Sequence, residues 1–295
     1  MDYIIETQDL LKCYGPKRAV DHVSLHVKRG DIYGIIGKNG AGKTTLMKLL
    51  LGLAVQKSGS IRLFGTEDLD PVRGRIGSLI EDPALYRTES AIENLRRFAI
   101  LIPTPEERLH ELLRFVGLGD VGGKPVRAFS LGMKQRLGIA VALMGNPELM
   151  ILDEPVNGLD PAGIKEIRDL ILELNRKGVT FLISSHLLDE LGKIATNYGI
   201  LANGVLTEEI TAAELREQCR GHLSVTVDDP GRAQQIIRQA APELETEIAG
   251  QTVLLHSDRL DAAEVNRRLV TANLRVSELR YQSRALEDFF IERMG

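Results

Sequence analysis

Tryptophan is absent from this 295-residue sequence, and cysteine occurs only twice. Cys13 and Cys219 are far apart and match no metal-ligand spacing, so we expect free thiols in a reducing compartment, the cytosol. No apolar run approaches the roughly 18 residues that a membrane-spanning helix needs, and residues 1–6 lack the pattern of a signal peptide. We therefore expect that any role at a membrane comes through a partner protein.

An excess of positive charge is also missing. The chain has 37 lysines and arginines against 41 aspartates and glutamates, which gives a formal net charge of −4. Because proteins that bind nucleic acid normally carry a basic excess, we expect no nucleic-acid partner. The apolar and charged fractions are ordinary for a soluble globular protein, and the length suits about two domains.

The most informative stretch is a glycine-rich loop. It matches the phosphate-binding pattern G-x-x-x-x-G-K-(S/T) at every fixed position, and it lies between an expected strand at 31–36 and an expected helix at 45–53 with an apolar face that includes Leu53. This context distinguishes a phosphate loop from an ordinary glycine-rich turn. The nucleotide-binding residues predicted here are Gly37, Lys38, Asn39, Gly40, Ala41, Gly42, Lys43, Thr44 and Thr45.

Backbone geometry explains why these residue types bind phosphate. Glycines let the main chain curl so that successive N–H groups point inward, and the following helix adds its unpaired N-terminal N–H groups. Lys43 can reach the outer phosphates, and the Thr44 hydroxyl can ligate Mg²⁺. The loop therefore predicts a bound nucleoside triphosphate with Mg²⁺.

Two acids follow a second apolar run of strand length at 149–153. Carboxyl ends of parallel strands are where open α/β sheets bind ligands, so Asp153 can hold Mg²⁺ there and Glu154 can reach an attacking water. A further strand at 180–185 ends before His186, which we expect at the same edge. A solvated pair of acids and a structural histidine are the ordinary alternatives, but the phosphate loop favours the functional interpretation.

Two other segments predict ligand contacts. Tyr14 lies in an expected turn before the phosphate loop, where its ring can stack on a base with Val20 as its apolar neighbour, although an exposed tyrosine often has no ligand. Residues 83–147 have the apolar spacing of a helical insertion. Within it Ser130 is expected to cap a helix, and the N-terminus of that helix predicts a second anion site that faces outward.

In this order, the motifs resemble the nucleotide-binding subunit of ABC (ATP-binding cassette) transporters over residues 3–215. The resemblance implies an α/β fold of the P-loop NTPase class, in which a mixed sheet core carries a helical subdomain, and it implies ATP and Mg²⁺ as cofactors. The matching segments are similar to the adenine-stacking aromatic (Tyr14), Walker A (37–45), Walker B (149–154), the D-loop (157–160) and the switch histidine (His186).

The family signature, usually Leu-Ser-Gly-Gly-Gln, has a variant form here. Residues 130–135 keep the serine and the second glycine, but they have leucine for the first glycine and Met-Lys before the glutamine. The resemblance implies that Ser130 and Gly132 complete the ATP site of a second cassette, in a homodimer that clamps two ATP molecules. It also implies an integral membrane permease as partner, with this chain on the cytoplasmic face of the membrane.

A second departure concerns residue 81. The family normally has glutamine at this place, where it senses Mg²⁺ and signals to the permease, but this chain has Glu81. A carboxylate meets Mg²⁺ more strongly than an amide, so we expect Glu81 to be a metal ligand beside Thr44 and Asp153. Glutamate here and the variant signature are similar to the lantibiotic and bacitracin export and immunity branch of the family.

Residues 216–295 follow a new pattern in the order β-α-β-β-α-β. It predicts a small accessory α+β domain, for which a ferredoxin-like fold is a candidate. That fold hosts many functions, so none is assigned by analogy. Regulation, dimer support and simple stabilisation stay open.

The sequence therefore predicts an ATP hydrolase that powers a separate permease, with Glu154 and His186 as catalytic residues. The family branch indicates export of a lantibiotic- or bacitracin-type peptide for self-protection or resistance. Export of another small amphipathic compound and a soluble, non-transport cassette ATPase stay open. A phosphate-loop kinase would leave the Ser130 loop and His186 unexplained, and Glu154 argues against a nucleotide sensor without turnover.

Overall fold

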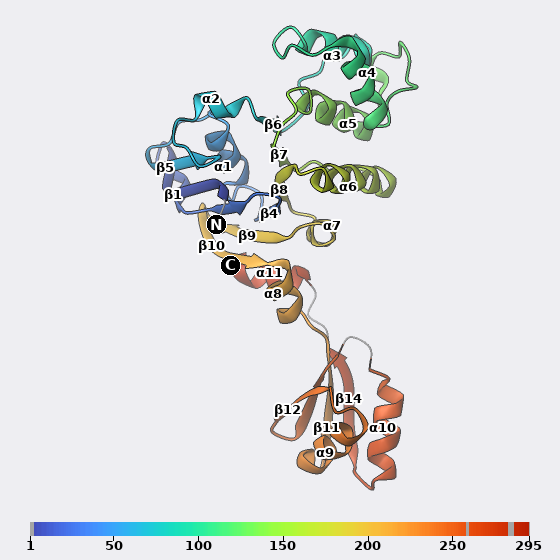
Figure 1. Cartoon of the computed structure of the whole chain (residues 1–295). Coiled ribbons are helices and arrows are strands. Elements are labelled where there is room, and N and C mark those ends of the chain that lie inside the picture. Colours follow the sequence, from blue (N-terminus) through green and yellow to red (C-terminus); the bar gives the residue numbers. More distant parts are fainter. Residues whose placement is uncertain (1–2, 258–259, 283–285, 295) are drawn as a thin grey trace. The chain divides into compact units, whose positions relative to one another are not determined.

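The computed structural model describes residues 3–257, 260–282 and 286–294. The chain divides into two compact units (Figure 1). Unit 1 consists of Met1–Ala212 together with Phe290–Gly295, and unit 2 consists of Ala213–Phe289. The chain thus returns to unit 1 at its C-terminal end, a feature that the predicted division into residues 1–215 and 216–295 did not include.

A sheet of six strands forms the centre of unit 1. Its strands are β4 (Ile32–Ile36), β6 (Ile76–Leu79), β7 (Leu149–Asp153), β8 (Thr180–Ser185), β9 (Asn197–Ala202) and β10 (Val205–Thr211). Their order is β10-β9-β4-β8-β7-β6, and all neighbours are parallel except β9 and β10. β4, β7 and β8 are buried along their whole length, as the continuous apolar runs of central parallel strands require.

Helix α1 (Lys43–Leu50) follows β4 through the phosphate loop. Gly42, with a φ of 110°, precedes the helix in a conformation that other residues rarely adopt. The helix buries Leu46 and Leu49, but Leu53, which was expected on the same face, is 67% exposed. The helix stops earlier than predicted because Gly52, with a φ of 74°, turns the chain in the left-handed region.

An antiparallel sheet packs against α1 and the central sheet in one buried core. Its strands are β1 (Tyr3–Tyr14), β2 (Lys17–Val23), β3 (His26–Lys28) and β5 (Ser58–Leu63). β1 pairs with all three of the others, and the turn from β1 to β2 has Gly15 at a φ of 57°. The shared core fixes the phosphate loop on rigid elements from both sheets.

Three helices lie together between β6 and β7 in sequence, and Figure 1 shows them as a group: α3 (Ala91–Phe98), α4 (Glu106–Phe115) and α5 (Leu131–Ala142). They contact one another, and α5 also contacts β6. The group begins with a capping box, in which Ser90 and Glu93 satisfy each other's backbone N–H groups. The helices lie within residues 83–147, where the sequence has helical spacing.

Shorter elements and one long helix complete the connections of unit 1. They are α2 (Asp70–Arg73), η1 (Val126–Ala128), α6 (Pro161–Arg176) and α7 (Leu188–Gly192), and α8 (Ala212–Gln218) begins at the boundary of the two units. α6 starts at Asp160, whose side chain accepts a hydrogen bond from Gly163 N. In the part of the chain described, no helix combines the length and apolarity needed to cross a bilayer.

Unit 2 has its own sheet and its own buried core. Its elements are β11 (His222–Val227), α9 (Pro230–Ala240), β12 (Glu245–Ala249), β13 (Thr252–His256), α10 (Ala262–Thr271) and β14 (Val276–Gln282). The strands pair in the antiparallel order β12-β13-β11-β14. The elements follow the order in which the sequence pattern places them, and the ferredoxin-like fold stays a prediction for this unit.

The last helix, α11 (Leu286–Met294), ends in unit 1. Phe290 is fully buried, and its ring centroid lies 5.7 Å from that of Tyr198 on β9. Arg293 Nε lies 2.6 Å from Glu208 Oε2 on β10. An apolar contact and an ion pair therefore hold the end of the chain against β9 and β10.

Candidate functional site

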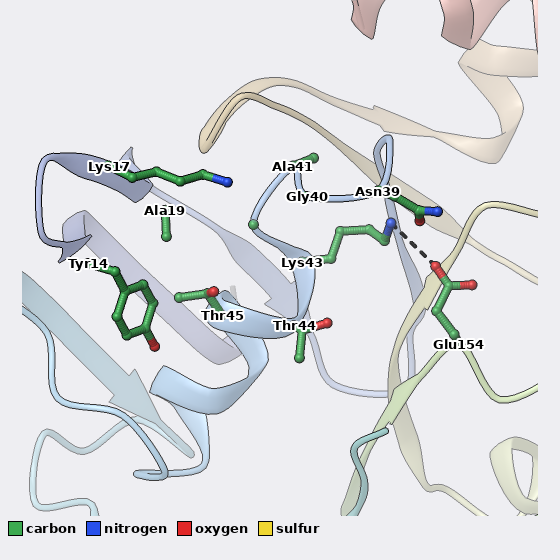
Figure 2. Close-up of a pocket in the computed structure, with 11 residues that line it drawn as sticks. Tyr14, Lys17, Ala19, Asn39, Gly40, Ala41, Lys43, Thr44, Thr45 and Glu154 are labelled. Atoms are coloured by element: carbon green, nitrogen blue, oxygen red, sulfur yellow. Dashed lines mark ion pairs between the residues drawn. The ribbon is translucent and has the colours of Figure 1, made fainter. Parts of the chain in front are cut away.

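The phosphate loop lines a cavity of about 260 Å³ (Figure 2). In this view Tyr14 and Glu154 lie on opposite sides of the loop, and Lys43 points from α1 toward Glu154. The residues that line the cavity are Tyr14, Lys17, Ala19, Asn39, Gly40, Ala41, Gly42, Lys43, Thr44, Thr45 and Glu154. The loop and the N-terminus of α1 thus face the same space as an aromatic ring and a carboxylate from distant parts of the sequence.

Lys43 supplies a buried positive charge at this cavity. Its side chain is only 6% exposed, and Nζ donates to the main-chain oxygen of Gly37 at 2.7 Å and to that of Lys38 at 3.4 Å. Nζ also lies 3.3 Å from Glu154 Oε1. These oxygens compensate for the loss of hydration of the ammonium, which is placed to meet a phosphate as a point charge.

Asp153 has both carboxylate oxygens hydrogen-bonded. Thr44 Oγ1 donates to Oδ2 at 2.7 Å, and Ser184 Oγ donates to Oδ1 at 2.5 Å. Because Mg²⁺ prefers hard oxygen donors, the Thr44 hydroxyl and the Asp153 carboxylate fit this ion. Among the described residues no group of three or more His, Cys, Asp or Glu could hold a metal. A site with one protein carboxylate suits a Mg²⁺ ion that takes its other ligands from phosphate and water.

Glu154 has a strained backbone and a side chain held from one side. Its φ is 49°, in the left-handed region, and its N–H donates to Ser184 O at 3.2 Å and Ser184 Oγ at 2.9 Å. His186 Nδ1 lies 2.7 Å from Glu154 Oε2, so Nδ1 carries the hydrogen. The two candidate catalytic residues therefore lie together at the carboxyl ends of β7 and β8.

The second carboxylate oxygen of Glu154 is buried, and within the described residues no donor is in hydrogen-bond geometry with it. Lys43 Nζ is 3.3 Å away, close enough for an ion pair but poorly aligned for a hydrogen bond. This oxygen can receive a hydrogen bond from water once the lysine turns toward a phosphate. A general base needs a carboxylate oxygen within hydrogen-bond reach of the water.

Tyr14 lies at the cavity, whereas Val20, its predicted apolar neighbour, lies in the core. Tyr14, at the end of β1, is 52% exposed and lines the cavity, with Lys12 Nζ 5.0 Å from its ring centroid. Val20 has no exposed surface and belongs to the core, whereas Lys17 and Ala19 of the same strand line the cavity. The predicted apolar neighbour of the ring is therefore replaced by Ala19, because Val20 faces the core from β2.

Glu81 points to a lysine. Its Oε1 accepts a hydrogen bond from Lys48 Nζ at 2.7 Å, and the Glu81 side chain is 65% exposed. The hydrogen bond to Glu81 is the largest of the effects that raise the pKa of Lys48, and the charge of Asp153 acts in the same direction. Glu81 is thus linked to the exposed side of α1, while Thr44 and Asp153 contact each other directly.

Ser130 and Gly132 lie at the start of α5, and neither belongs to the residues that line the described cavity. Ser130 is exposed, and its Oγ accepts a hydrogen bond from Met133 N at 3.3 Å, as expected for a helix cap. The side chain nearest to Gly132 is Leu159, in the turn before α6. The loop is therefore accessible from outside rather than directed into the cavity of its own chain.

The sequence interpretation missed Lys17, Ala19 and Ser184. Lys17 and Ala19 could have been found from the strand pattern, because the strand that follows the turn pairs with the strand that ends at Tyr14. Ser184 gave no local signal. Its contact with Asp153 depends on the register of β7 against β8, in which these two residues are paired.

Comparisons with known proteins agree with this geometry. The family described as ABC transporter matches residues 20–157. The chain is 39% identical over 300 aligned positions to the bacitracin transport ATP-binding protein BcrA of Enterococcus faecalis, an alignment that covers 100% of this chain and 97% of BcrA. It is 42% identical over 217 positions to the lantibiotic transport ATP-binding protein SrtF of Streptococcus pyogenes, covering 73% of this chain and 95% of SrtF.

A solved structure supports the same conclusion. CbiO1 of Clostridium perfringens, described as part of the ABC transporter complex cbiONQ, has a TM-score of 0.67 and 26% identity, covering 82% of this chain and 97% of CbiO1. The predicted mixed α/β cassette is confirmed by this likeness. From the similarity to BcrA over its whole length and from the fold, we conclude that this chain belongs to the ABC transporter family, as an ATP-binding subunit.

Proposed function

We propose that this chain binds ATP with Mg²⁺ and hydrolyses it to drive a separate integral membrane permease. The observation that carries the proposal is the convergence of Lys43, Asp153, Glu154 and His186 beside the phosphate loop. The chain would act on the cytoplasmic face of the membrane, attached through its permease. BcrA and SrtF are named for bacitracin and lantibiotic transport, which supports a peptide antibiotic as the exported substrate.

Binding starts at the loop. The N–H groups of the loop and of the N-terminus of α1 donate hydrogen bonds to the phosphate oxygens. Lys43 exchanges its main-chain partners for phosphate oxygens. Thr44 and Asp153 would hold Mg²⁺, which would supply positive charge to the bound phosphates. Tyr14, half-exposed at the other end of the cavity, offers a ring face to the adenine base.

Hydrolysis depends on Glu154 and His186. When Lys43 turns to the phosphates, Oε1 of Glu154 is free to accept a hydrogen bond from the attacking water and to orient it toward the γ-phosphate. His186 Nδ1 donates to the other oxygen of the same carboxylate, and its Nε2, when that nitrogen is also protonated, can donate to the γ-phosphate. The reaction therefore needs the two side chains as a unit.

A second copy of the chain completes the site. Ser130 and Gly132 lie at an exposed helix N-terminus, which favours an anion. In the proposed homodimer this loop of one copy contacts the γ-phosphate held by the other. Hydrolysis removes the γ-phosphate that both copies contact, and the dimer opens.

The test of the ATPase assignment is Glu154→Gln, which keeps the shape of the side chain and removes its basicity. We expect ATP affinity to stay within a few-fold of the wild-type value and turnover to fall by about 100-fold or more, the typical contribution of a general base. The control is Glu173→Gln, the same change in a surface ion pair with Lys177. Steady-state hydrolysis by Glu154→Gln at the wild-type rate would contradict the role of Glu154.

Purification from detergent-solubilised membranes tests the partner. A tagged chain should retain an integral membrane subunit, and the pair should lower the sensitivity of its host to a lantibiotic or bacitracin. Protection against other amphipathic compounds alone would favour the alternative substrate class. Recovery of the chain only from the soluble fraction, with no integral partner, would favour a soluble cassette ATPase and contradict the transport assignment.

A further inference from the structure

Ser184 connects the two acids of the site through one hydroxyl group. It lies on β8, two residues before His186, and has no exposed surface. In the parallel pairing of β7 with β8 it is the partner of Asp153. Its Oγ donates to Asp153 Oδ1 at 2.5 Å and accepts from Glu154 N at 2.9 Å.

The first of these contacts fixes the direction of the Asp153 carboxylate. Thr44 holds Oδ2 at 2.7 Å, so the two hydroxyls hold the two oxygens and prevent rotation of the group. Asp153 is only 6% exposed, and water does not easily replace a lost donor at a buried oxygen. Without the Ser184 hydroxyl, Oδ1 would be left without its donor, and the carboxylate could turn away from the position set by Thr44.

The second contact supports the strained backbone at Glu154. A positive φ in a residue other than glycine persists only where the surroundings hold it. Here the N–H of Glu154 is shared between the carbonyl oxygen and the hydroxyl of Ser184, at 3.2 and 2.9 Å. This backbone conformation places the Glu154 carboxylate between Lys43 and His186.

We propose that Ser184 is a positioning residue of the hydrolytic site. Its hydroxyl sets the Asp153 carboxylate for Mg²⁺ and the Glu154 backbone for the attacking water. The inference rests on the proposed ATPase function, because both acids are assigned through it. It predicts that the loss of one buried hydroxyl reduces both Mg²⁺-dependent nucleotide binding and turnover.

Three substitutions separate the hydroxyl from the volume of the side chain. Ser184→Ala removes the hydroxyl. Ser184→Thr and Ser184→Val introduce side chains of nearly the same shape, of which threonine keeps the hydroxyl and valine has a methyl group in its place. Thr180→Ala is the matched control, since Thr180 is also fully buried on β8 and its Oγ1 accepts from Gly30 N at 2.9 Å, at the opposite end of the strand. Thermal unfolding establishes that each variant is folded before function is compared.

The measurement that does not depend on turnover is the affinity for a fluorescent ATP analogue, titrated with Mg²⁺ and with EDTA. We expect Ser184→Ala and Ser184→Val to lose about 10- to 100-fold of the affinity measured with Mg²⁺, the usual effect of removing a partner of a metal ligand, and a similar factor in kcat. Affinity in EDTA should not change. Ser184→Thr and Thr180→Ala should keep the wild-type dependence on Mg²⁺.

Two results would overturn the assignment of Ser184. One is a wild-type Mg²⁺ effect and kcat in both hydroxyl-free variants; the other is an equal loss in Thr180→Ala, which would indicate general destabilisation. If Ser184→Ala fails to fold, the Thr and Val variants decide by their difference alone. If the wild-type protein shows neither Mg²⁺-dependent binding nor hydrolysis, the proposed function itself is contradicted. If the wild type is active and the variants are unaffected, only the role of Ser184 is contradicted.

Discussion

Lys48 Nζ lies 2.7 Å from Glu81 Oε1 and thereby connects helix α1 to the segment that follows β6. Lys48 is one turn of helix beyond Thr44, so both residues lie on the same side of α1. The pair links the Glu81 carboxylate to a residue one helical turn from Thr44, which belongs to the proposed Mg²⁺ site. The ammonium of Lys48 balances the negative charge of Glu81.

Replacing Glu81 should change coupling more than stability. The ion pair is largely exposed, and such pairs contribute about 0–1 kcal/mol, so Glu81→Gln should unfold at nearly the wild-type temperature. If Glu81 contacts Mg²⁺ during turnover, permease-stimulated ATPase activity should fall in Glu81→Gln and by about 10-fold in Glu81→Ala. The control is Glu67→Gln, in the exposed pair with Arg62. Wild-type rates for both Glu81 variants, measured with the permease present, would exclude a role for this residue.

Gly132→Ala should separate folding from dimer formation. An added Cβ would lie 3.8 Å from Leu159 Cδ2 and 4.0 Å from Gly163 Cα, ordinary contact distances, so the monomer should tolerate it. Alanine is also favoured over glycine in helices by up to about 1 kcal/mol. We expect unchanged or slightly higher stability and a loss of ATP-induced dimers, because a methyl group would occupy the space of the incoming phosphate.

The matched control for Gly132→Ala is Gly231→Ala, which is also at the second position of a helix with space for a Cβ. Light scattering of both variants in a Glu154→Gln background, with saturating Mg-ATP, gives the oligomeric state. The parent Glu154→Gln protein should form dimers under these conditions. If the Gly132 variant forms the same dimer as the Gly231 variant, the signature loop is not at the interface.

The C-terminal helix should stabilise unit 1. Phe290 is fully buried and contacts Tyr198, whereas Ile291 on the same helix is 54% exposed. Phe290→Ala should lower the free energy of unfolding by about 3–5 kcal/mol, the usual cost of deleting a buried aromatic side chain. Ile291→Ala should change it much less. Urea denaturation measures both, and similar values for the two variants would mean that α11 contributes little.

Stability at high pH should depend on Tyr33. Burial, followed by the nearby Glu209 carboxylate, raises the pKa of Tyr33 well above its ordinary value near 10, and its hydroxyl donates to Glu209 Oε1 at 2.6 Å. Above about pH 10 the unfolded chain loses this proton first, so the stability that the neutral phenol provides is present below that pH and is lost as the pH rises. Tyr33→Phe should remove this part of the pH dependence.

Urea denaturation between pH 8 and 11 tests the effect of Tyr33. The difference in unfolding free energy between wild type and Tyr33→Phe should shrink over this range, from about 1 kcal/mol for the lost hydrogen bond at its lower end. Tyr86→Phe, at a ring that is 48% exposed, is the control. A difference that stays constant with pH would show that the Tyr33 phenol does not titrate differently in the folded and unfolded states.

Much of the site could be predicted from local sequence. The phosphate loop, the acids after β7 and the histidine after β8 are each recognisable because a short run of residues determines a strand, a turn and the group at the strand end. Parallel strands then bring these ends to one edge without further information. The fold class followed from the same motifs, since their order matches one family.

Side-chain partners could not be predicted in this way. Val20 faces the core rather than the ring of Tyr14, and Glu81 contacts Lys48, because strand packing and helix position select these neighbours. Leu53 is exposed because a left-handed glycine ends α1 before it. These contacts depend on how strands and helices pack against one another, which a local sequence pattern does not show.

The sequence by itself determined that the phosphate loop and two acids at a strand end belong to one cassette, because each of these features is formed by a few consecutive residues. Only the tertiary structure decided that Ser184 holds Asp153 and Glu154, and that the last helix returns to β9 and β10. Both depend on contacts across long sequence separations. Strand register and the closure of the chain onto its own core determine such contacts.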